Sequence, residues 1–171
     1  MRISDLKAAE FKHFYRTYLN VLDDVELMDS LQDGRKWFKK FMDKLPDEKL
    51  QYRYQEGKWT IAEVLLHIID AERVFQYRAF RFSRNDRTAL SGFDQNDFAA
   101  ECESEKRNKE SILKEYLSVR NATLRLFETM DAIKLKRVGT ASGMPWSVAA
   151  LGFVISGHQK HHADILEDRY R

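Results

Sequence analysis

The feature that most constrains the fold is a helical apolar stripe whose first residue is fixed by a capping motif. Thr60 is followed three residues later by Glu63, which is the spacing of a capping box, where each side chain bonds the other residue's backbone. From Ile61 to about Ser83 apolar residues recur at intervals of three and four. Because a helix of this length extends roughly 35 Å, the pattern predicts one element that spans a whole domain.

Three further stretches of the chain have the same period. They predict helices from about Val25 to Lys44, from Ser104 to Met130, and from an N-cap at Ser147 to the C-terminus. The 171 residues include only 2 Pro and 7 Gly, which leaves little material for turns, and there is no convincing strand pattern. The sequence therefore predicts an all-α fold, an antiparallel four-helix bundle with long crossover connections.

The length of the chain fits one domain, since about 150 residues per domain is usual. Residues 25–171 are expected to form the bundle domain, and residues 1–24 an N-terminal arm or short helix. Residues 85–102 lack a sustained period and exceed the usual length of a bundle connection, so we expect them to cross over the bundle or to wall a pocket. Residues 133–145 contain three helix breakers and are expected to form a loop.

Charge and composition disfavour several classes of protein. The 29 Lys and Arg are interspersed with 27 Asp and Glu, which is weak support for binding to nucleic acid. The longest strongly apolar stretch, Val148 to Ile155, is far shorter than the ~20 residues of a membrane span. Cys102 is the only cysteine, so no internal disulfide can form. We therefore expect a cytoplasmic protein that binds neither nucleic acid nor membranes.

Three of the five histidines lie on apolar helical seams. His158 and His162 take successive positions on the core-facing seam of the last predicted helix, and His67 lies on the corresponding seam of the second. One buried histidine is ordinary, but three bring up to six ring nitrogens together, and each unpaired polar group costs roughly 1 to 3 kcal/mol. A divalent metal bound by all three would remove this cost and would keep open coordination positions, as catalytic sites do.

Two familiar metal motifs fit the sequence poorly. Gln159 follows His158, so HQKHH lacks the glutamate base of the HExxH proteases. Glu63 precedes His67 by four residues and no second pair of this kind exists, which argues against a di-iron bundle. His161 is one residue off the seam and is expected at the rim, and His13 is expected to be unrelated.

Several longer motifs resemble those of the DinB-like superfamily of metal-binding four-helix bundles. The resemblance covers about Asp24 to Tyr170. It is carried by GKWTIAEVLLHIIDAERVFQYRAFRFSRND, SGFDQND, VRNATL, GTASG and ISGHQKHHADILEDRY, in this order. It implies a divalent metal (zinc, nickel or iron) held by His67, His158 and His162. It also implies a homodimer, since homodimers are common in this superfamily.

Other polar residues are candidates for a catalytic or binding role. Arg120 stands on the inward seam of the third predicted helix, either as an edge arginine whose head reaches water or as an anchor for a substrate carboxylate or thiolate. Arg78 has a similar claim. Asp70, three residues after His67, could orient a metal ligand or could lie exposed. Asp94, in the crossover, could overhang the pocket.

Two functions remain open at this point. The resemblance implies relatives that are thiol-dependent S-transferases, a mycothiol-dependent isomerase and proteins proposed to be metal-dependent hydrolases. The first hypothesis is therefore a metal-dependent enzyme, an S-transferase or a hydrolase, that acts on a small-molecule substrate with or without a low-molecular-weight thiol. The alternative is a non-catalytic stress-response module in which the metal serves structure or sensing.

Overall fold

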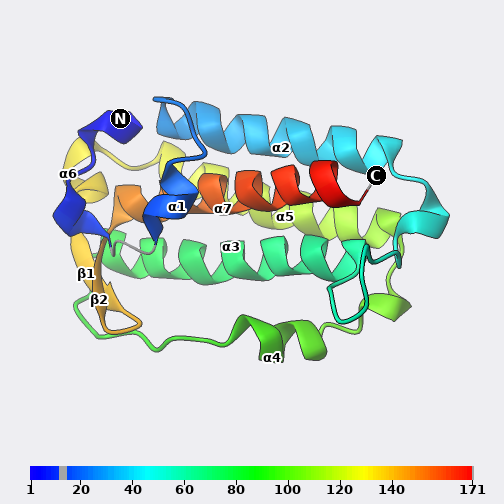
Figure 1. The fold of residues 1–171 in the computed structure, drawn as a ribbon. Helices are drawn as coiled ribbons and strands as arrows, with labels where there is room; N and C mark the ends of the chain where they lie inside the picture. The colour runs from blue at the N-terminus through cyan, green and yellow to red at the C-terminus, as the bar shows by residue number, and fades with distance from the viewer. Residues whose placement is uncertain (12–14, 171) are drawn as a thin grey trace.

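The computed structural model describes residues 1–11 and 15–170, and four long helices form its bundle (Figure 1). Helices α3 and α2 each pack on both α7 and α5, so the four helices form a square with α3 and α2 at opposite corners. This confirms the predicted all-α four-helix bundle. The long helices are α2 (Leu27–Lys44), α3 (Ile61–Ser83), α5 (Lys109–Glu128) and α7 (Val148–Arg169).

The predicted antiparallel arrangement is only partly right. In Figure 1, α2 and α7 run in one direction and α3 and α5 in the other, so the neighbours α3 and α5 are parallel. The reason is the crossover at residues 84–108, which returns along the length of the bundle before α5 begins. The crossover includes α4 (Gln95–Ala100) and a 3₁₀ turn (Ser104–Lys106).

The helix starts follow the local capping chemistry. Thr60 and Glu63 form the predicted capping box, in which the Glu63 amide donates to Thr60 Oγ1 at 3.1 Å. Ser147 Oγ accepts from the Ala150 amide at 3.0 Å and caps α7 as predicted. Helix α5 begins later than the predicted Ser104, because the side chain of Asn108 caps it.

The prediction of a loop without strands before α7 was wrong. Strands β1 (Val138–Ala141) and β2 (Met144–Ser147) form an antiparallel hairpin. Its two turn residues, Ser142 and Gly143, have φ values of 53° and 72°, which is the left-handed pair that a two-residue type I′ turn needs. Strands of four residues are too short to produce a readable alternation, so the pattern did not reveal them. The α6 turn (Ala132–Leu135) precedes the hairpin.

The N-terminal segment packs against the bundle. Its short helix α1 (Arg16–Leu19) lies on α7, and Leu19 is buried in the core. A Cβ added to Gly157 of α7 would lie 2.0 Å from the Tyr18 carbonyl oxygen, so the two backbones touch at this point. The amino group of Met1 pairs with Glu26 at 2.6 Å. This segment therefore covers the face made by α3 and α7.

The core is divided by a layer of polar side chains. One apolar cluster includes Phe75 and Leu151, toward the hairpin, and the other includes Leu65 and Leu166, toward the opposite end of the bundle. All four long helices place polar side chains where the clusters meet, and all of these are buried except His162, which is half-buried. We call this set the central polar layer: Ser30, His67, Glu72, Arg120, Thr123, Ser156, His158, Gln159 and His162.

None of the helices in the described residues is long and apolar enough to cross a membrane.

Candidate metal centre

Three histidines converge between α3 and α7. His67 comes from α3, and His158 and His162 come from successive turns of α7, as the seam argument predicted. One nitrogen from each ring lies within 4.8 Å of the other two. The ring centroids are 4.7 Å apart for His67 and His158, and 4.6 Å apart for His158 and His162. Among the described residues, this is the cluster that could hold a metal ion.

Burial keeps these imidazoles neutral. It lowers the pKa of His67 to about 4 and that of His162 to about 3, the latter assisted by the neighbouring histidines. It lowers the pKa of His158 well below its usual value, and His162 and His67 add to this effect. A neutral imidazole has the free lone pair that a metal needs.

The donor set fits a divalent metal. His67 Nε2 and His158 Nε2 face each other at 2.9 Å, so one must donate to the other. Among residues 1–11 and 15–170, the three rings make no other hydrogen bond. Three neutral nitrogen donors with few protein partners match the ligand type of zinc and related ions, and a three-ligand set leaves positions for water or substrate.

A cavity of about 310 Å³ opens beside the histidines. His67 and His158 line it together with Asp94 of the crossover, which therefore overhangs the pocket as expected. Its other walls come from the N-terminal segment, α3 and the crossover, and most of the large side chains are aromatic: Tyr15, Tyr18, Phe75 and Phe93. The cavity could therefore take a small molecule with an apolar body beside a metal.

Aromatic rings hold the histidines in place. The Trp59 ring lies 4.9 Å from the His67 ring, and the Tyr18 ring lies 5.2 Å from the His158 ring. Tyr18 also contacts His161, at 5.4 Å. His161 is half-buried at the edge of the cluster, consistent with the expected rim position, while His13 lies outside the described residues.

Arg120 does not lie at the edge of the bundle, which was one of the two positions that the sequence left open. Its guanidinium is fully buried, so it does not reach water, and it is engaged within the protein. Its Nε and Nη2 donate to the two carboxylate oxygens of Glu72 at 2.7 and 2.8 Å. Nη1 donates to the Leu31 carbonyl at 2.7 Å, and Nη2 also donates to Gln159 Oε1 at 2.6 Å. These bonds occupy the guanidinium group, which the sequence left open as either an edge group or a substrate anchor.

Asp70 also lies apart from the histidines. Its carboxylate accepts from Arg73 Nη1 at 3.1 Å, and Arg73 in turn pairs with Glu115 of α5 at 2.7 Å. Burial raises the pKa of Asp70, although Arg73 opposes the shift. Asp70 is thus bound within α3 to Arg73, which joins α3 to α5, and no bond between Asp70 and a histidine is found in the described part of the chain.

Sequence reasoning missed Glu72 and the role of Gln159. Both lie in the central polar layer, where Gln159 Nε2 donates to the Gly34 carbonyl at 2.7 Å and Tyr116 donates to Gln159 Oε1 at 3.0 Å. The signal was present, since Glu72 interrupts the apolar series Ile68, Phe75 and Ala79 on α3. A carboxylate on one seam and an arginine on another could have indicated a buried ion pair.

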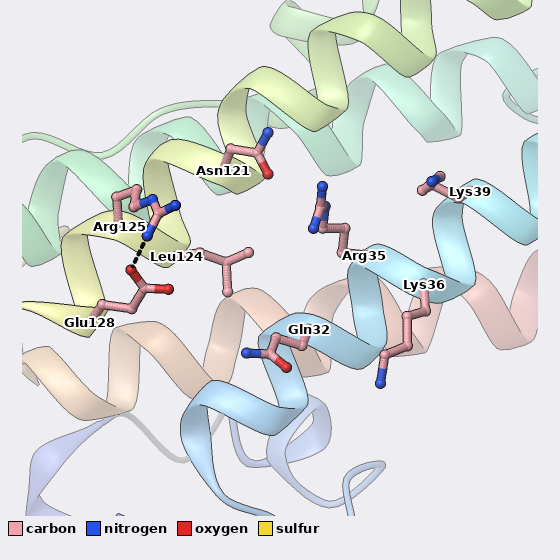
Figure 2. Close-up of a pocket in the computed structure, with 8 residues that line it drawn as sticks. All are labelled: Gln32, Arg35, Lys36, Lys39, Asn121, Leu124, Arg125 and Glu128. Carbon is pink, nitrogen blue, oxygen red and sulfur yellow. Dashed lines mark hydrogen bonds and ion pairs between the residues drawn. The ribbon is translucent and has the colours of Figure 1, made fainter.

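A larger groove lies on another face of the bundle and is not part of this centre. It measures about 660 Å³ and lies between α2 and α5, where Figure 2 shows Arg35 and Asn121 facing each other across it. Half of its lining residues are basic, and the Arg125 side chain pairs with Glu128 at 2.8 Å. None of its lining residues is a histidine, so this larger groove is separate from the histidine cluster.

Comparisons with known proteins identify the family of this chain. Residues 30–166 match the sequence model of the DinB superfamily. A protein of Geobacillus thermodenitrificans (strain NG80-2), named "Putative metal-dependent hydrolase", is 33% identical over 134 residues, which cover 74% of this chain and 73% of that protein.

Two solved structures share the fold. YfiT from Bacillus subtilis, described as "a probable metal-dependent hydrolase with an unusual four-helix bundle topology", has a TM-score of 0.72 at 16% identity and covers 96% of this chain and 90% of its own. The mycothiol-dependent maleylpyruvate isomerase has a TM-score of 0.67 at 12% identity, over 96% of this chain and 62% of its own. With a family model that matches most of its length, this chain belongs to the DinB superfamily.

Proposed function

We propose that this chain is a metal-dependent hydrolase of small molecules, with His67, His158 and His162 as its metal ligands. One observation carries the proposal: three neutral imidazoles bring their nitrogens within 4.8 Å of one another beside a cavity of about 310 Å³. The name of the Geobacillus relative and the description of YfiT support this reaction class.

The chain's own side chains would prepare the site. The aromatic walls at Tyr15, Tyr18 and Phe75 exclude bulk water from one side of the cavity, and the burial of His67 and His158 keeps them in the ligating form at neutral pH. A divalent ion held there would supply Lewis-acid activation of water or of a substrate carbonyl. Asp94 lies at the crossover side of the cavity, where it can accept a hydrogen bond from a ligand.

Thiol transfer is the second candidate. The observation in its favour is the fold shared with a mycothiol-dependent isomerase. The same three-histidine site could lower the pKa of a bound thiol instead of water. The two reactions differ in their requirement for an added low-molecular-weight thiol, which makes them separable in one assay.

Elemental analysis of the untagged protein tests the metal ligands. We expect about one divalent ion per chain in the wild type and a strong loss in His67→Ala and in His158→Ala. His161→Ala is the matched control, because His161 neighbours His162 on the same helix but is not in the cluster. A wild type that stays metal-free after incubation with zinc, nickel, iron and manganese would refute the metal centre.

Turnover then separates the functions. The metal-loaded protein is assayed with ester and amide substrates, and with thiols plus an electrophilic acceptor. Hydrolysis that is lost in His158→Ala and kept in His161→Ala supports the hydrolase. Activity only in the presence of a thiol would favour the transferase, and a metal-loaded protein inactive in both assays would favour the non-catalytic module.

A further inference from the structure

Arg78 is a buried cation without an acidic partner. Only 2% of its surface is exposed, and the described residues place no carboxylate in an ion pair with it. Its recorded acceptors are neutral: Nη2 donates to the Ser91 carbonyl at 3.0 Å and to Ser142 Oγ at 2.9 Å. Residues 12–14 and 171 lie outside the described ranges but carry no acidic side chain. Buried charges are normally paired, so this one is an exception that calls for an explanation.

Arg120 provides the internal contrast. It is equally buried, but Glu72 neutralises it with two hydrogen bonds. For Arg78, burial lowers the pKa, and the charge effect that opposes this comes from Tyr15. The fold therefore supplies a counter-charge for one buried arginine and leaves the other without one.

The position of Arg78 connects it to the cavity at the histidines. His67, Ala71 and Phe75 line this cavity from α3, and Arg78 continues the same helical stripe one turn beyond Phe75. Helical side chains lean toward the N-terminus of their helix, which directs Arg78 back toward the cavity. Its Cζ lies 5.8 Å from the centre of the Phe75 ring and 5.9 Å from that of Phe93, and both rings line the cavity.

We propose that Arg78 is the electrostatic anchor for an anionic ligand, so that the cavity prefers a small carboxylate whose apolar body lies between Phe75 and Phe93. The guanidinium sits directly behind the aromatic wall, where the low local dielectric lets its charge act over several ångströms. Among the described residues that line the cavity, Asp94 is the one with a carboxylate. It lies on the crossover, and its Oδ1 accepts a hydrogen bond from the Asn96 amide and caps α4. The inference rests on the proposed function in that it assigns a ligand class to the same cavity.

A purely structural role would give different results. Arg78 joins the crossover at Ser91 to the hairpin turn at Ser142, and loss of this link alone would weaken neutral and anionic ligands equally. An anchor acts through charge and therefore changes selectivity. The ratio of the affinity for an anionic ligand to the affinity for a neutral ligand therefore separates an anchor from a structural role.

The test uses benzoate and benzyl alcohol, which share an aromatic body and differ in charge. Their dissociation constants are measured by NMR titration on chelator-treated, metal-free protein. The variants are Arg78→Met and Arg78→Lys, and Arg84→Met is the matched control, because it removes an exposed arginine just beyond the end of α3. A parallel titration with Co²⁺-loaded protein compares 3-mercaptopropionate with 3-mercapto-1-propanol through the thiolate-to-cobalt absorption band.

We expect the wild type to bind benzoate about tenfold more tightly than benzyl alcohol. Arg78→Met should abolish this preference, while Arg78→Lys and Arg84→Met should retain it. Equal affinities in the wild type, or an unchanged preference in Arg78→Met, would overturn the proposal. If Arg78→Met does not fold, the wild-type ratio and Arg78→Lys decide the question, since a lost preference in a folded Arg78→Lys would indicate a geometric link instead of a charge.

The failure of the metal centre and the failure of the anchor are distinguishable. If the protein takes up no Co²⁺, the metal-free titration with benzoate still tests Arg78. If Co²⁺ binds and both thiols bind equally well, the metal centre stands and the anchor is refuted.

Discussion

The central polar layer contains two neighbouring groups of polar side chains, one on α3, α5 and α7 and one on α3 and α7, which differ in how their polar atoms are satisfied. In the first, Glu72, Arg120 and Gln159 bond to one another and to backbone carbonyls of α2. In the second, His67 and His158 share the one hydrogen bond that the three histidines make among the described residues, and these two border a cavity. Burial of polar residues therefore does not identify a functional site by itself. The informative property is whether the fold completes their bonding.

The two groups should respond in opposite ways to the loss of one member. A completed network leaves uncompensated groups behind when one partner is removed. The histidines have few protein partners to lose, so their removal affects metal binding more than folding.

The largest effect is expected for Glu72→Gln. This change leaves the fully buried Arg120 without a counter-charge, which costs about 3 to 5 kcal/mol. Urea unfolding of the metal-free protein measures the loss. Glu115→Gln is the control, because Glu115 pairs with Arg73 and Arg107 nearer the surface and should cost about 1 kcal/mol or less. Similar losses for the two variants would show that the network is no more than a set of ordinary ion pairs.

The histidines should give the metal-free protein a characteristic dependence on pH. In the folded state the pKa of His67 is lowered to about 4 and that of His162 to about 3, whereas unfolded histidine has a pKa of ~6.5. The unfolded chain therefore binds more protons below pH 6.5, so stability is complete above that value and falls as the pH drops toward 4. By pH 5 the loss is on the order of 2 kcal/mol for each histidine.

Urea unfolding at pH 7 and pH 5 measures this loss. Asp24 and Asp86 contribute little to it, since their lowered pKa values, each about 2, cost stability mainly below about pH 5. His67→Leu should reduce the difference between the two pH values. A wild type equally stable at both would mean that the rings ionise freely in the fold.

A third effect concerns a glycine that the network requires. Alanine normally stabilises a helix relative to glycine by about 1 kcal/mol. At Gly34 of α2, however, a Cβ would lie 2.6 Å from Arg120 Nη1 and 2.9 Å from Gln159 Oε1. Gly34→Ala should therefore destabilise the protein by about 1 to 3 kcal/mol in urea unfolding. Gln32→Ala, at an exposed position on the same helix, should be close to neutral, and a stabilising Gly34→Ala would show that the network can shift.

The sequence predicted much of this fold because its strongest signals are local. The Thr60 capping box, the start of α7 at Ser147 and the apolar seams all depend on residues within a few positions of one another. The three histidines were predicted as one group because both seams face the same core. The direction of α5 was not predictable in this way, since it depends on a crossover that returns along the bundle.

Long-range partners account for the other differences. Arg120 on its seam suggested either a surface or a substrate role, because nothing near it in sequence reveals Glu72, 48 residues away. The hairpin was missed for a different reason, since its strands of four residues are too short to show an alternating pattern. Residues whose role depends on a single distant partner are therefore the ones that periodicity misassigns.

The smallest predicted effect tests the comparison most directly, because it has the opposite sign in the two groups. His67→Leu replaces a buried imidazole that has one recorded hydrogen bond by an apolar side chain that can pack against Trp59, so the metal-free protein should gain about 1 kcal/mol at pH 7 while metal binding is lost. Gln159→Leu is the matched change on α7. It removes the acceptor of Arg120 and Tyr116 and the donor to Gly34, so the protein should lose stability. Urea unfolding of both variants decides the point, since a loss of stability in His67→Leu as large as that in Gln159→Leu would mean that the histidines form a second structural network and not a prepared metal centre.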